Sequence, residues 1–312
     1  MPAFPLAHIS FAVADESTRR KWDAFLRDVF AADTLYEVLM TPEAERLKLD
    51  RQQTLLAIGN TVLYAAAPAG AGLQPDSVIG NMLRANAGPH RWIGIALRVA
   101  DLDAARNWVR ERGWEPRSYP LLADRYFLVD RGETLGMRLE FLWGDLANDP
   151  RLRSDWDPLR WRDRHPLGLE GLQSIGVSCN SLDVARAVFT DKLGWPEIAQ
   201  RRIDGAACAA FLIGDAVIEA MQPLDADSEL AGHARETRGI WCLTFQVRDA
   251  AAAAEYLRSK DLRLLGDTEK RFAIDPDQAF GRWLWFTGER PEGYPPIPIP
   301  HLMRSPAQLT KL

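Results

Sequence analysis

Four stretches of the chain share one plan, and this repetition constrains the fold more than any other feature. Each is an apolar run of strand length followed by a helix-like run, over residues 6–27, 92–114, 172–195 and 239–259. Two of the helical runs have nearly the same sequence, with Leu-Asp-Ala-Ala-Arg after Asp101 and Leu-Asp-Val-Ala-Arg after Ser181. Both end at a Gly-Trp pair. Such repetition indicates one small unit used several times, because a single unit cannot bury its apolar face alone.

Further strands are expected after each helix. Residues 54–58 and 61–65 flank the turn signal Gly59-Asn60 and are typical of a hairpin. Comparable apolar runs lie at 126–130, 137–142, 209–213, 216–220 and 280–287. We therefore predict an α+β fold of four βαβββ modules, paired two by two into two cupped, barrel-like mixed β-sheets.

The periodicity breaks at residues 145–168, which are rich in Asp, Arg, Pro and Trp. This composition is typical of a segment between domains, and Trp156 and Trp161 indicate that it packs onto the surface. The predicted organisation is an N-terminal domain over 1–144, a linker over 145–168 and a C-terminal domain over 169–290. A Pro-rich tail over 291–312 is expected to lie extended over the body.

Composition excludes several classes of function. The formal net charge of -5 shows no excess of basic residues, so nucleic acid is not an expected partner. No apolar run approaches the roughly 18 residues that cross a bilayer, and residues 1–5 lack the basic start of a secretory signal. Cys179, Cys208 and Cys242 are widely spaced, as expected of buried thiols in a reducing compartment. These observations predict a cytoplasmic protein without a membrane partner.

Known short motifs narrow the chemistry further. The chain has no Gly-rich phosphate loop, no Gly-x-Ser-x-Gly elbow and no His-Glu-x-x-His pair. Their absence argues against nucleotide-dependent chemistry and against an α/β-hydrolase.

The four openings, the Gly-Trp helix ends and the stretch 231–241 together resemble the vicinal oxygen chelate superfamily. Its members include glyoxalase I, methylmalonyl-CoA epimerase, bleomycin-resistance proteins and extradiol ring-cleaving dioxygenases. The resemblance covers residues 6 to 290, and the two-plus-two layout is most similar to the bacterial extradiol dioxygenases. Residues 231–241 are similar to the lead-in before the second metal strand of epimerase-like members.

The resemblance implies a divalent metal inside a cup, held by His and Glu from the first and last strands of each module. The first-strand position falls on His8, Gly94, Ser174 and Cys242, and the last-strand position on Tyr64, Glu140, Glu219 and Trp285. The expected metal ligands are therefore His8, Glu140 and Tyr64, for Fe, Mn, Zn or Ni. Glu140, Tyr64 and Glu219 are the candidate catalytic groups, with Tyr64 as a ligand or a proton donor.

The C-terminal cup departs from the dioxygenase pattern, which would place two His and one Glu there. This chain has no histidine at those positions, so the dioxygenase reaction is in doubt. We expect Trp241, Trp283 and Trp285 to fill that cup or to line an apolar pocket. Glu219 is either a general base with a pKa raised by burial or the partner of Arg201 or Arg202.

Each candidate also has a structural interpretation. A lone histidine on an apolar strand, such as His8, often only packs, and so does an aromatic residue such as Tyr64. Gly94 either clears space for substrate or marks a bulge or a close approach. Among the other histidines, His90 lies four residues before the ligand register, His233 lies on an expected surface helix, and His165 and His301 lie in Pro-flanked loops.

Three functional hypotheses follow. The first is an enzyme that acts on a small, apolar carbonyl, enol or aromatic compound by metal polarisation of the substrate oxygens; isomerase, lyase and dioxygenase outcomes share this step. The second is a metal-free protein that sequesters a hydrophobic small molecule. The third makes one cup catalytic and the other structural. A monomer or a homodimer suits all three, because four modules already complete both cups.

Overall fold

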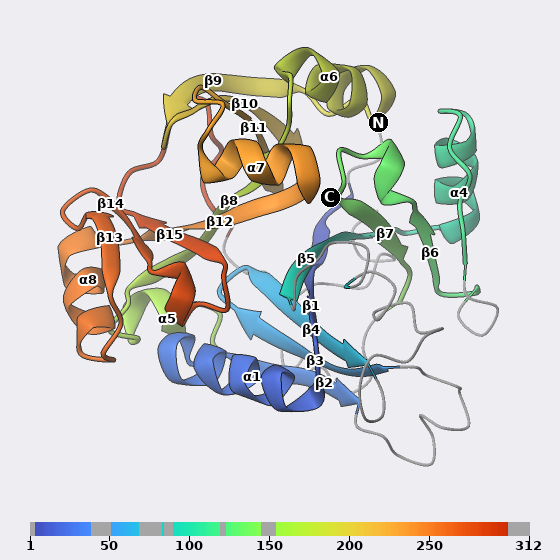
Figure 1. The fold of residues 1–312 in the computed structure, drawn as a ribbon. Helices are drawn as coiled ribbons and strands as arrows, with labels where there is room; N and C mark the ends of the chain where they lie inside the picture. The colour runs from blue at the N-terminus through green and yellow to red at the C-terminus, as the bar shows by residue number, and fades with distance from the viewer. Residues whose placement is uncertain are drawn as a thin grey trace.

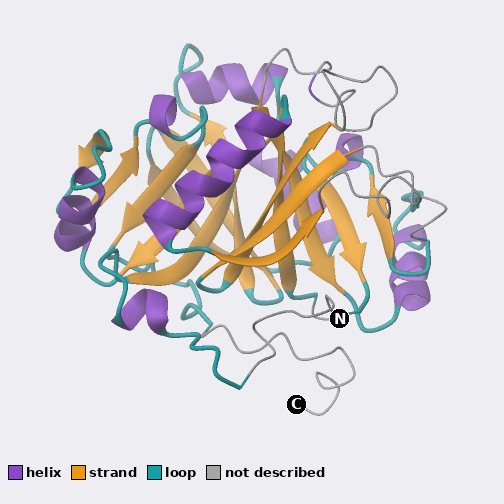
Figure 2. Cartoon of the chain, turned by 90° about the horizontal axis from the view of Figure 1, so that it is seen from below, coloured by secondary structure: helices purple, strands orange, loops and turns teal. Residues whose placement is uncertain are grey.

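Two mixed β-sheets form the centre of the molecule, with helices around their periphery (Figures 1 and 2). The computed structural model describes residues 4–38, 51–68, 83, 90–118, 123–144 and 154–298. The N-terminal sheet has the strand order β2-β3-β4-β1-β5-β7-β6, and the C-terminal sheet has the order β13-β14-β15-β12-β8-β11-β10-β9. The predicted α+β fold with two cupped sheets is confirmed.

The strands and helices have the following bounds. The N-terminal sheet contains β1 (Leu6–Val13), β2 (Asp33–Val38), β3 (Arg51–Ile58), β4 (Thr61–Pro68), β5 (His90–Arg98), β6 (Tyr126–Val129) and β7 (Arg138–Leu142). The C-terminal sheet contains β8 (Leu169–Ser178), β9 (Glu197–Ile203), β10 (Ala206–Ile213), β11 (Ala216–Pro223), β12 (Gly239–Val247), β13 (Leu264–Asp267), β14 (Arg271–Ile274) and β15 (Trp283–Thr287). The helices described are α1 (Glu16–Phe30), α4 (Leu102–Arg110), α5 (Arg160–Asp163), α6 (Leu182–Arg186), α7 (Glu229–Glu236) and α8 (Ala250–Arg258).

Each module begins as its sequence predicts. The side chains of Asp15, Asp101 and Asp249 each accept a hydrogen bond from the backbone N–H three residues on, and Ser181 caps α6 through Asp183. Such caps satisfy N–H groups that the first turn leaves without partners. In the second module, the described part of the first closing strand is a single bridge between Arg117 and Leu128.

Helix α1 packs against both halves of the molecule. It contacts β3 and β4 of the N-terminal sheet, and its Phe30 ring lies 5.5 Å from that of Phe245 on β12. Trp22 meets Phe280 of the C-terminal half edge-on at 5.3 Å. One apolar core therefore runs through both sheets. Figure 2 shows α1 as the long helix that crosses in front of the strands.

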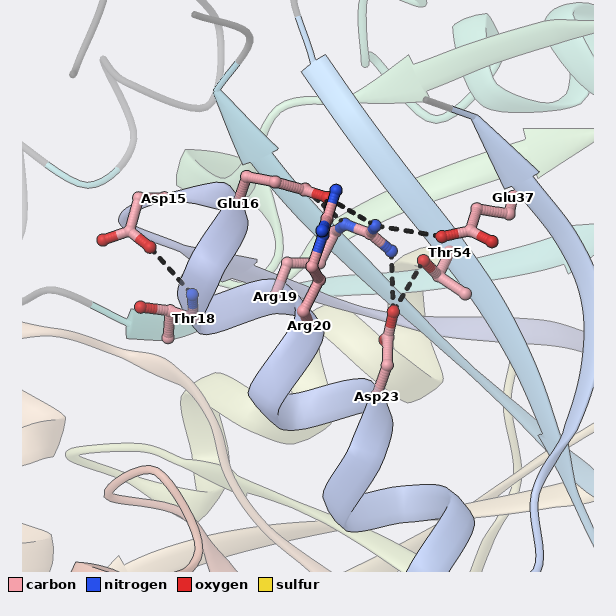
Figure 3. A network of polar contacts seen from close by, with 8 residues as sticks. All are labelled: Asp15, Glu16, Thr18, Arg19, Arg20, Asp23, Glu37 and Thr54. Atoms are coloured by element: carbon pink, nitrogen blue, oxygen red, sulfur yellow. Dashed lines mark hydrogen bonds and ion pairs between the residues drawn. The ribbon is translucent and has the colours of Figure 1, made fainter. Parts of the chain in front are cut away.

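A buried ionic network fixes the first turns of α1 (Figure 3). The side chain of Arg19 is fully buried and bonds to Glu16, to Asp23 at 2.6 Å and to Glu37 of β2 at 3.1 Å. Asp23 also accepts a hydrogen bond from Thr54 of β3 at 2.8 Å. Burial lowers the pKa of Arg19, but its three carboxylate partners outweigh burial and raise that pKa above its usual value.

The segment before β8 packs down as expected. Trp161 is buried and donates its indole N–H to the carbonyl of Phe30 at 2.8 Å, while Trp156 donates to Asp33 at 3.1 Å. Residues 145–153 lie outside the described part of the chain. The domain limits at 144, 168 and 290 stay a prediction. None of the described helices is long and apolar enough to cross a membrane.

Replacing Arg19 by alanine should lower the free energy of unfolding by about 3–5 kcal/mol, because Asp23 is left as a buried carboxylate without its cation. The side chain of Arg20 is 70% exposed and also bonds to Glu16, so Arg20→Ala should cost less than about 0.5 kcal/mol. Urea unfolding followed by tryptophan fluorescence measures both values. Equal midpoints for the two variants would contradict the role given to the network.

Candidate active site in the N-terminal cup

The strand pairing shows that equivalent residues of the four modules occupy equivalent positions in the sheets. In every module, the last-strand position pairs with the residue two places after the first-strand position. The four pairs are Ser10 with Tyr64, Ala96 with Glu140, Gly176 with Glu219 and Thr244 with Trp285. The register predicted from the sequence therefore holds in both sheets.

His8 and Glu140 come together in the N-terminal cup. His8 on β1 pairs with Ala96 on β5, which pairs with Glu140 on β7, so the three residues form one row across the sheet. Nε2 of His8 lies 3.5 Å from Oε2 of Glu140, and both side chains are about one-tenth exposed or less. Nε2 is buried and makes no hydrogen bond within the described part of the chain. A buried polar atom without a hydrogen bond costs about 1–3 kcal/mol, so Nε2 is a candidate position for a ligand.

Glu140 is held in its ionised form. Burial raises the pKa of this carboxyl, but the adjacent imidazole of His8 and the positive charges of Arg138 and Arg51 lower it more. The net pKa lies below the ordinary value for glutamate. The residue is therefore suited to orient an imidazole or bind a cation, and unsuited to donate a proton at neutral pH.

Tyr64 lies beside this pair. Its ring centroid is 5.2 Å from that of His8, and its hydroxyl donates to Oε1 of Gln53 at 2.7 Å. The phenol thus packs against the imidazole. Its roles as third ligand or proton donor stay predictions.

Gly94 is explained by a close approach between strands. A Cβ atom at this position would lie 1.9 Å from the carbonyl oxygen of Arg138 on β7. The pairing of β1 with β5 shifts by one residue beside Gly94, and Ile93 lines the cavity. Of the two interpretations of Gly94, the structure supports the bulge and close approach, and space cleared for substrate is wrong.

A cavity of about 260 Å³ opens beside His8 and Glu140. Its apolar wall includes Leu35, Leu55, Val62, Ile93 and Leu142, and its polar lining adds Gln53 and Tyr64 to the pair. Four arginines also line it, namely Arg51, Arg98, Arg125 and Arg138. These arginines were not predicted from the sequence. Strand alternation was the available signal, since Arg138 and Glu140 are two residues apart on β7 and face the same side.

The C-terminal cup holds a closed polar cluster around Glu219. Ser174 donates to Oε2 of Glu219 at 2.6 Å, Arg201 donates to Oε1 at 2.7 Å, and the hydroxyl of Tyr294 also donates to Oε1. Tyr294 belongs to the tail and is buried in this cup. Of the two interpretations of Glu219, the structure therefore supports the ion pair, with Arg201 as the partner. Tail residues 299–312 lie outside the described part of the chain.

Aromatic side chains occupy the rest of this cup, as predicted. The rings of Trp283 and Trp285 stack with centroids 5.4 Å apart, and Trp241 lies 6.1 Å from Trp283. Arg271 covers Trp285 at 4.6 Å from the ring centroid. Cys242 is buried beneath them, and burial raises the pKa of its thiol. Cys179 and Cys208 are likewise free and buried.

None of the other described histidines lines the N-terminal cavity. His90 packs against Phe280, and His165 against the ring of Tyr256. His233 is half-buried on α7, a helix with exposed residues as expected, and its Nδ1 lies 2.8 Å from Oγ of Ser178. Burial and the charges of Arg282 and Arg91 lower its pKa to about 3. His301 lies outside the described residues.

Residues 171–273 match the sequence model of the Glyoxalase/Bleomycin resistance protein/Dioxygenase superfamily. They form a domain of this superfamily. The expected family is thereby confirmed over these residues. A mutant of 4-hydroxymandelate synthase from Streptomyces coelicolor has a similar fold over 100% of this chain and 100% of that chain, with a TM-score of 0.69 and 14% identity. The two-domain form of the fold is therefore shared along the whole chain.

A shorter protein is similar to part of the chain. Methylmalonyl-CoA epimerase from Mycobacterium tuberculosis is 28% identical and matches 40% of this chain and 91% of its own, with a TM-score of 0.36. No curated protein matches the chain in sequence.

Replacing Glu219 by alanine should lower the free energy of unfolding by about 3 kcal/mol or more, because Arg201 loses its buried carboxylate. Arg202 is exposed on the other face of β9, so Arg202→Ala is the matched control and should be nearly neutral. Thermal unfolding compares the two variants. A Glu219→Ala protein that is as stable as the parent, yet inactive, would instead support the general-base interpretation.

Proposed function

We propose that the N-terminal cup is the reaction centre of a vicinal oxygen chelate enzyme that acts on a small molecule. The observation that carries this proposal is the buried Nε2 of His8, which lacks a hydrogen bond and lies 3.5 Å from Glu140 in the wall of the cavity. The C-terminal cup serves as structural support. Its only glutamate at a ligand position, Glu219, is bound by three neighbouring side chains.

The donor pair fits a divalent metal in kind and in spacing. A neutral imidazole and an ionised carboxylate are donors that Fe, Mn, Zn and Ni accept, and Glu140 is kept ionised by its surroundings. The set contains two donors, since no three His, Cys, Asp or Glu side chains come together within the described residues. Tyr64 is the proposed third. A metal held there would polarise two neighbouring substrate oxygens.

The protein's own residues would orient the substrate and keep water away. Tyr64 packs against the imidazole of His8 and donates its hydroxyl to Gln53, which supports the ring of His8 on one side. The apolar wall would receive the body of a carbonyl, enol or aromatic compound. Once a ligand fills the cavity, interactions with a developing charge are stronger there than in water.

A second candidate function is the sequestration of a hydrophobic small molecule without a metal. The two-donor set favours it, because catalytic sites usually supply three protein ligands. The cytoplasmic location and the monomeric or homodimeric state stay predictions under both functions.

Metal analysis separates the two functions. We expect the protein, purified without chelators or reconstituted with Fe, Mn, Zn or Ni, to bind one metal per chain. His8→Ala should weaken that binding by about a hundredfold or more, since loss of an outer-shell partner alone costs roughly 10–100-fold. Elemental analysis and calorimetric titration measure the change, with His165→Ala as a control outside the cavity. A parent protein that takes up no metal, yet binds aromatic compounds, would overturn the enzyme proposal in favour of sequestration.

A further inference from the structure

Three buried sulfur atoms lie close together on the inner face of the C-terminal cup. Cys208 on β10 and Met221 on β11 are directly opposite each other in an antiparallel pair, which places their Cβ atoms about 4.5–5.5 Å apart. The thiol of Cys242 on β12 donates to Sδ of Met221 at 3.8 Å. All three residues are at most 2% exposed, and they belong to one buried cluster. Three strands therefore each contribute one sulfur to the same place.

A glycine makes this arrangement possible. Strand β8 lies between β11 and β12, and Gly176 on β8 pairs with Cys242. A Cβ atom at Gly176 would lie 2.4 Å from Sγ of Cys242 and 2.7 Å from Sδ of Met221. Because the intervening strand has no side chain at this position, the two sulfurs can meet across it.

The spacing of the sulfurs fits a single metal ion. Two sulfurs 3.8 Å apart subtend an angle of roughly 110° at an ion about 2.3 Å from each, which is the usual metal–sulfur distance in proteins. This angle is close to that between two ligands of a tetrahedral or trigonal ion. No three His, Cys, Asp or Glu side chains come together within the described residues, so Met221 is needed as the third donor beside the two cysteines.

The type of donor selects the class of ion. Thiolate and thioether sulfurs are soft ligands that favour Cu(I), whereas hard cations such as Mg²⁺ and Ca²⁺ require oxygen. Structural zinc sites take four Cys or His ligands. Two thiols and one thioether do not make up that set, so a soft monovalent ion fits this cluster better than zinc.

Binding of such an ion requires a change in protonation. Burial raises the pKa of Cys208 to about 12 and also raises that of Cys242, so both are neutral thiols at neutral pH. One monovalent ion that binds both thiolates and the thioether therefore releases two protons and leaves one negative charge at the site. The positive charge of Arg201 favours the thiolate of Cys208, and that of Arg271 favours the thiolate of Cys242.

Two carboxylates act in the opposite direction, because the negative charges of Glu219 and Asp204 raise both thiol pKa values. Each carboxylate is itself paired with one of the two arginines. Glu219 lies 2.6 Å from Arg201, and Asp204 lies 2.8 Å from Arg271. The charges around the sulfurs are thus balanced before an ion binds.

The cluster lies behind side chains that reach the solvent. Trp241, Trp283 and Trp285 pack against it and are only partly buried. A metal site needs an entry path, and these rings separate the sulfurs from the outside.

We infer that Cys208, Met221 and Cys242 form a binding site for one soft monovalent metal ion, of which Cu(I) is the physiological example. Its donors are sulfurs, whereas the family resemblance implies His and Glu. An ion held there would join β10, β11 and β12. The inference does not depend on the reaction proposed for the N-terminal cup.

Anaerobic titration of the reduced full-length protein with Cu(I) tests the inference. Competition with the chromophoric chelator bicinchoninate gives the stoichiometry and the affinity. We expect one tightly bound Cu(I) per chain. Thermal unfolding of the parent protein should shift to higher temperature with Cu(I), because an ion that binds the folded state stabilises it.

Variants locate the ion. Cys208→Ala and Cys242→Ala should each weaken Cu(I) binding by about a hundredfold or more, since loss of an outer-shell partner alone costs roughly 10–100-fold. Met221→Leu conserves the side-chain volume and is expected to preserve the fold, and it should weaken binding by about tenfold. Cys179→Ala is the matched control, because Cys179 is also a buried free thiol but belongs to a different core cluster. It should leave the affinity unchanged.

Three results overturn the inference. The first is a parent protein that takes up no Cu(I) in competition with bicinchoninate. The second is an unchanged affinity in Met221→Leu together with either folded cysteine variant. The third is a loss of Cu(I) in His8→Ala, which would place the ion in the N-terminal cup. Retention of Cu(I) in His8→Ala supports the sulfur site whether or not the N-terminal cup binds a metal.

A cysteine variant that fails to fold does not remove the test, because the parent protein and Met221→Leu still decide it. Circular dichroism of each variant shows whether it is folded.

Discussion

The antiparallel pairing of first strands is the constraint on which the rest of the structure depends. β1 runs against β5, and β8 runs against β12, so each pair of modules closes into one cup. The same pairing sets His8 opposite Ala96 and, through β7, in one row with Glu140. A slip of one residue would turn His8 into the core and Ile9 into the cavity, because side chains alternate along a strand.

One scaffold has produced two different interiors. The C-terminal cup is occupied by stacked tryptophans and by Glu219, whose oxygens are bound by Ser174, Arg201 and Tyr294. The N-terminal cup has smaller apolar residues at its wall and keeps a cavity beside His8. The register of the strands is the same in both sheets. The two cups therefore differ in the volume of their side chains and in how fully their buried polar groups are hydrogen-bonded. This asymmetry agrees with the hypothesis that one cup is reactive and the other structural.

Much of the architecture could be predicted from the sequence because it depends on local patterns. Period-two strands, acid-capped helices and repeated Gly-Trp ends determine the module, and their repetition determines the two cups. The pairing of β1 with β4 and of β5 with β7 then follows the family plan, which is why the positions of Tyr64 and Glu140 were found in register. The sequence did not reveal that Tyr294 of the tail would enter the C-terminal cup. A Pro-rich stretch has no regular hydrophobic pattern from which its packing partner could be predicted.

The candidate site could be predicted from the sequence only in part. His8 and Glu140 could be chosen from their positions in the repeated module, and the open choices for Gly94 and Glu219 required distances that only packing supplies. The four arginines come from the strands and from the loop before β6, and no local pattern joins them. The sequence by itself determined the module, its repetition and the positions that face each cup, because these follow from local periodicity. Only the tertiary structure decided which cup keeps a cavity and what charge lines it, because both depend on side chains that are brought together from distant strands.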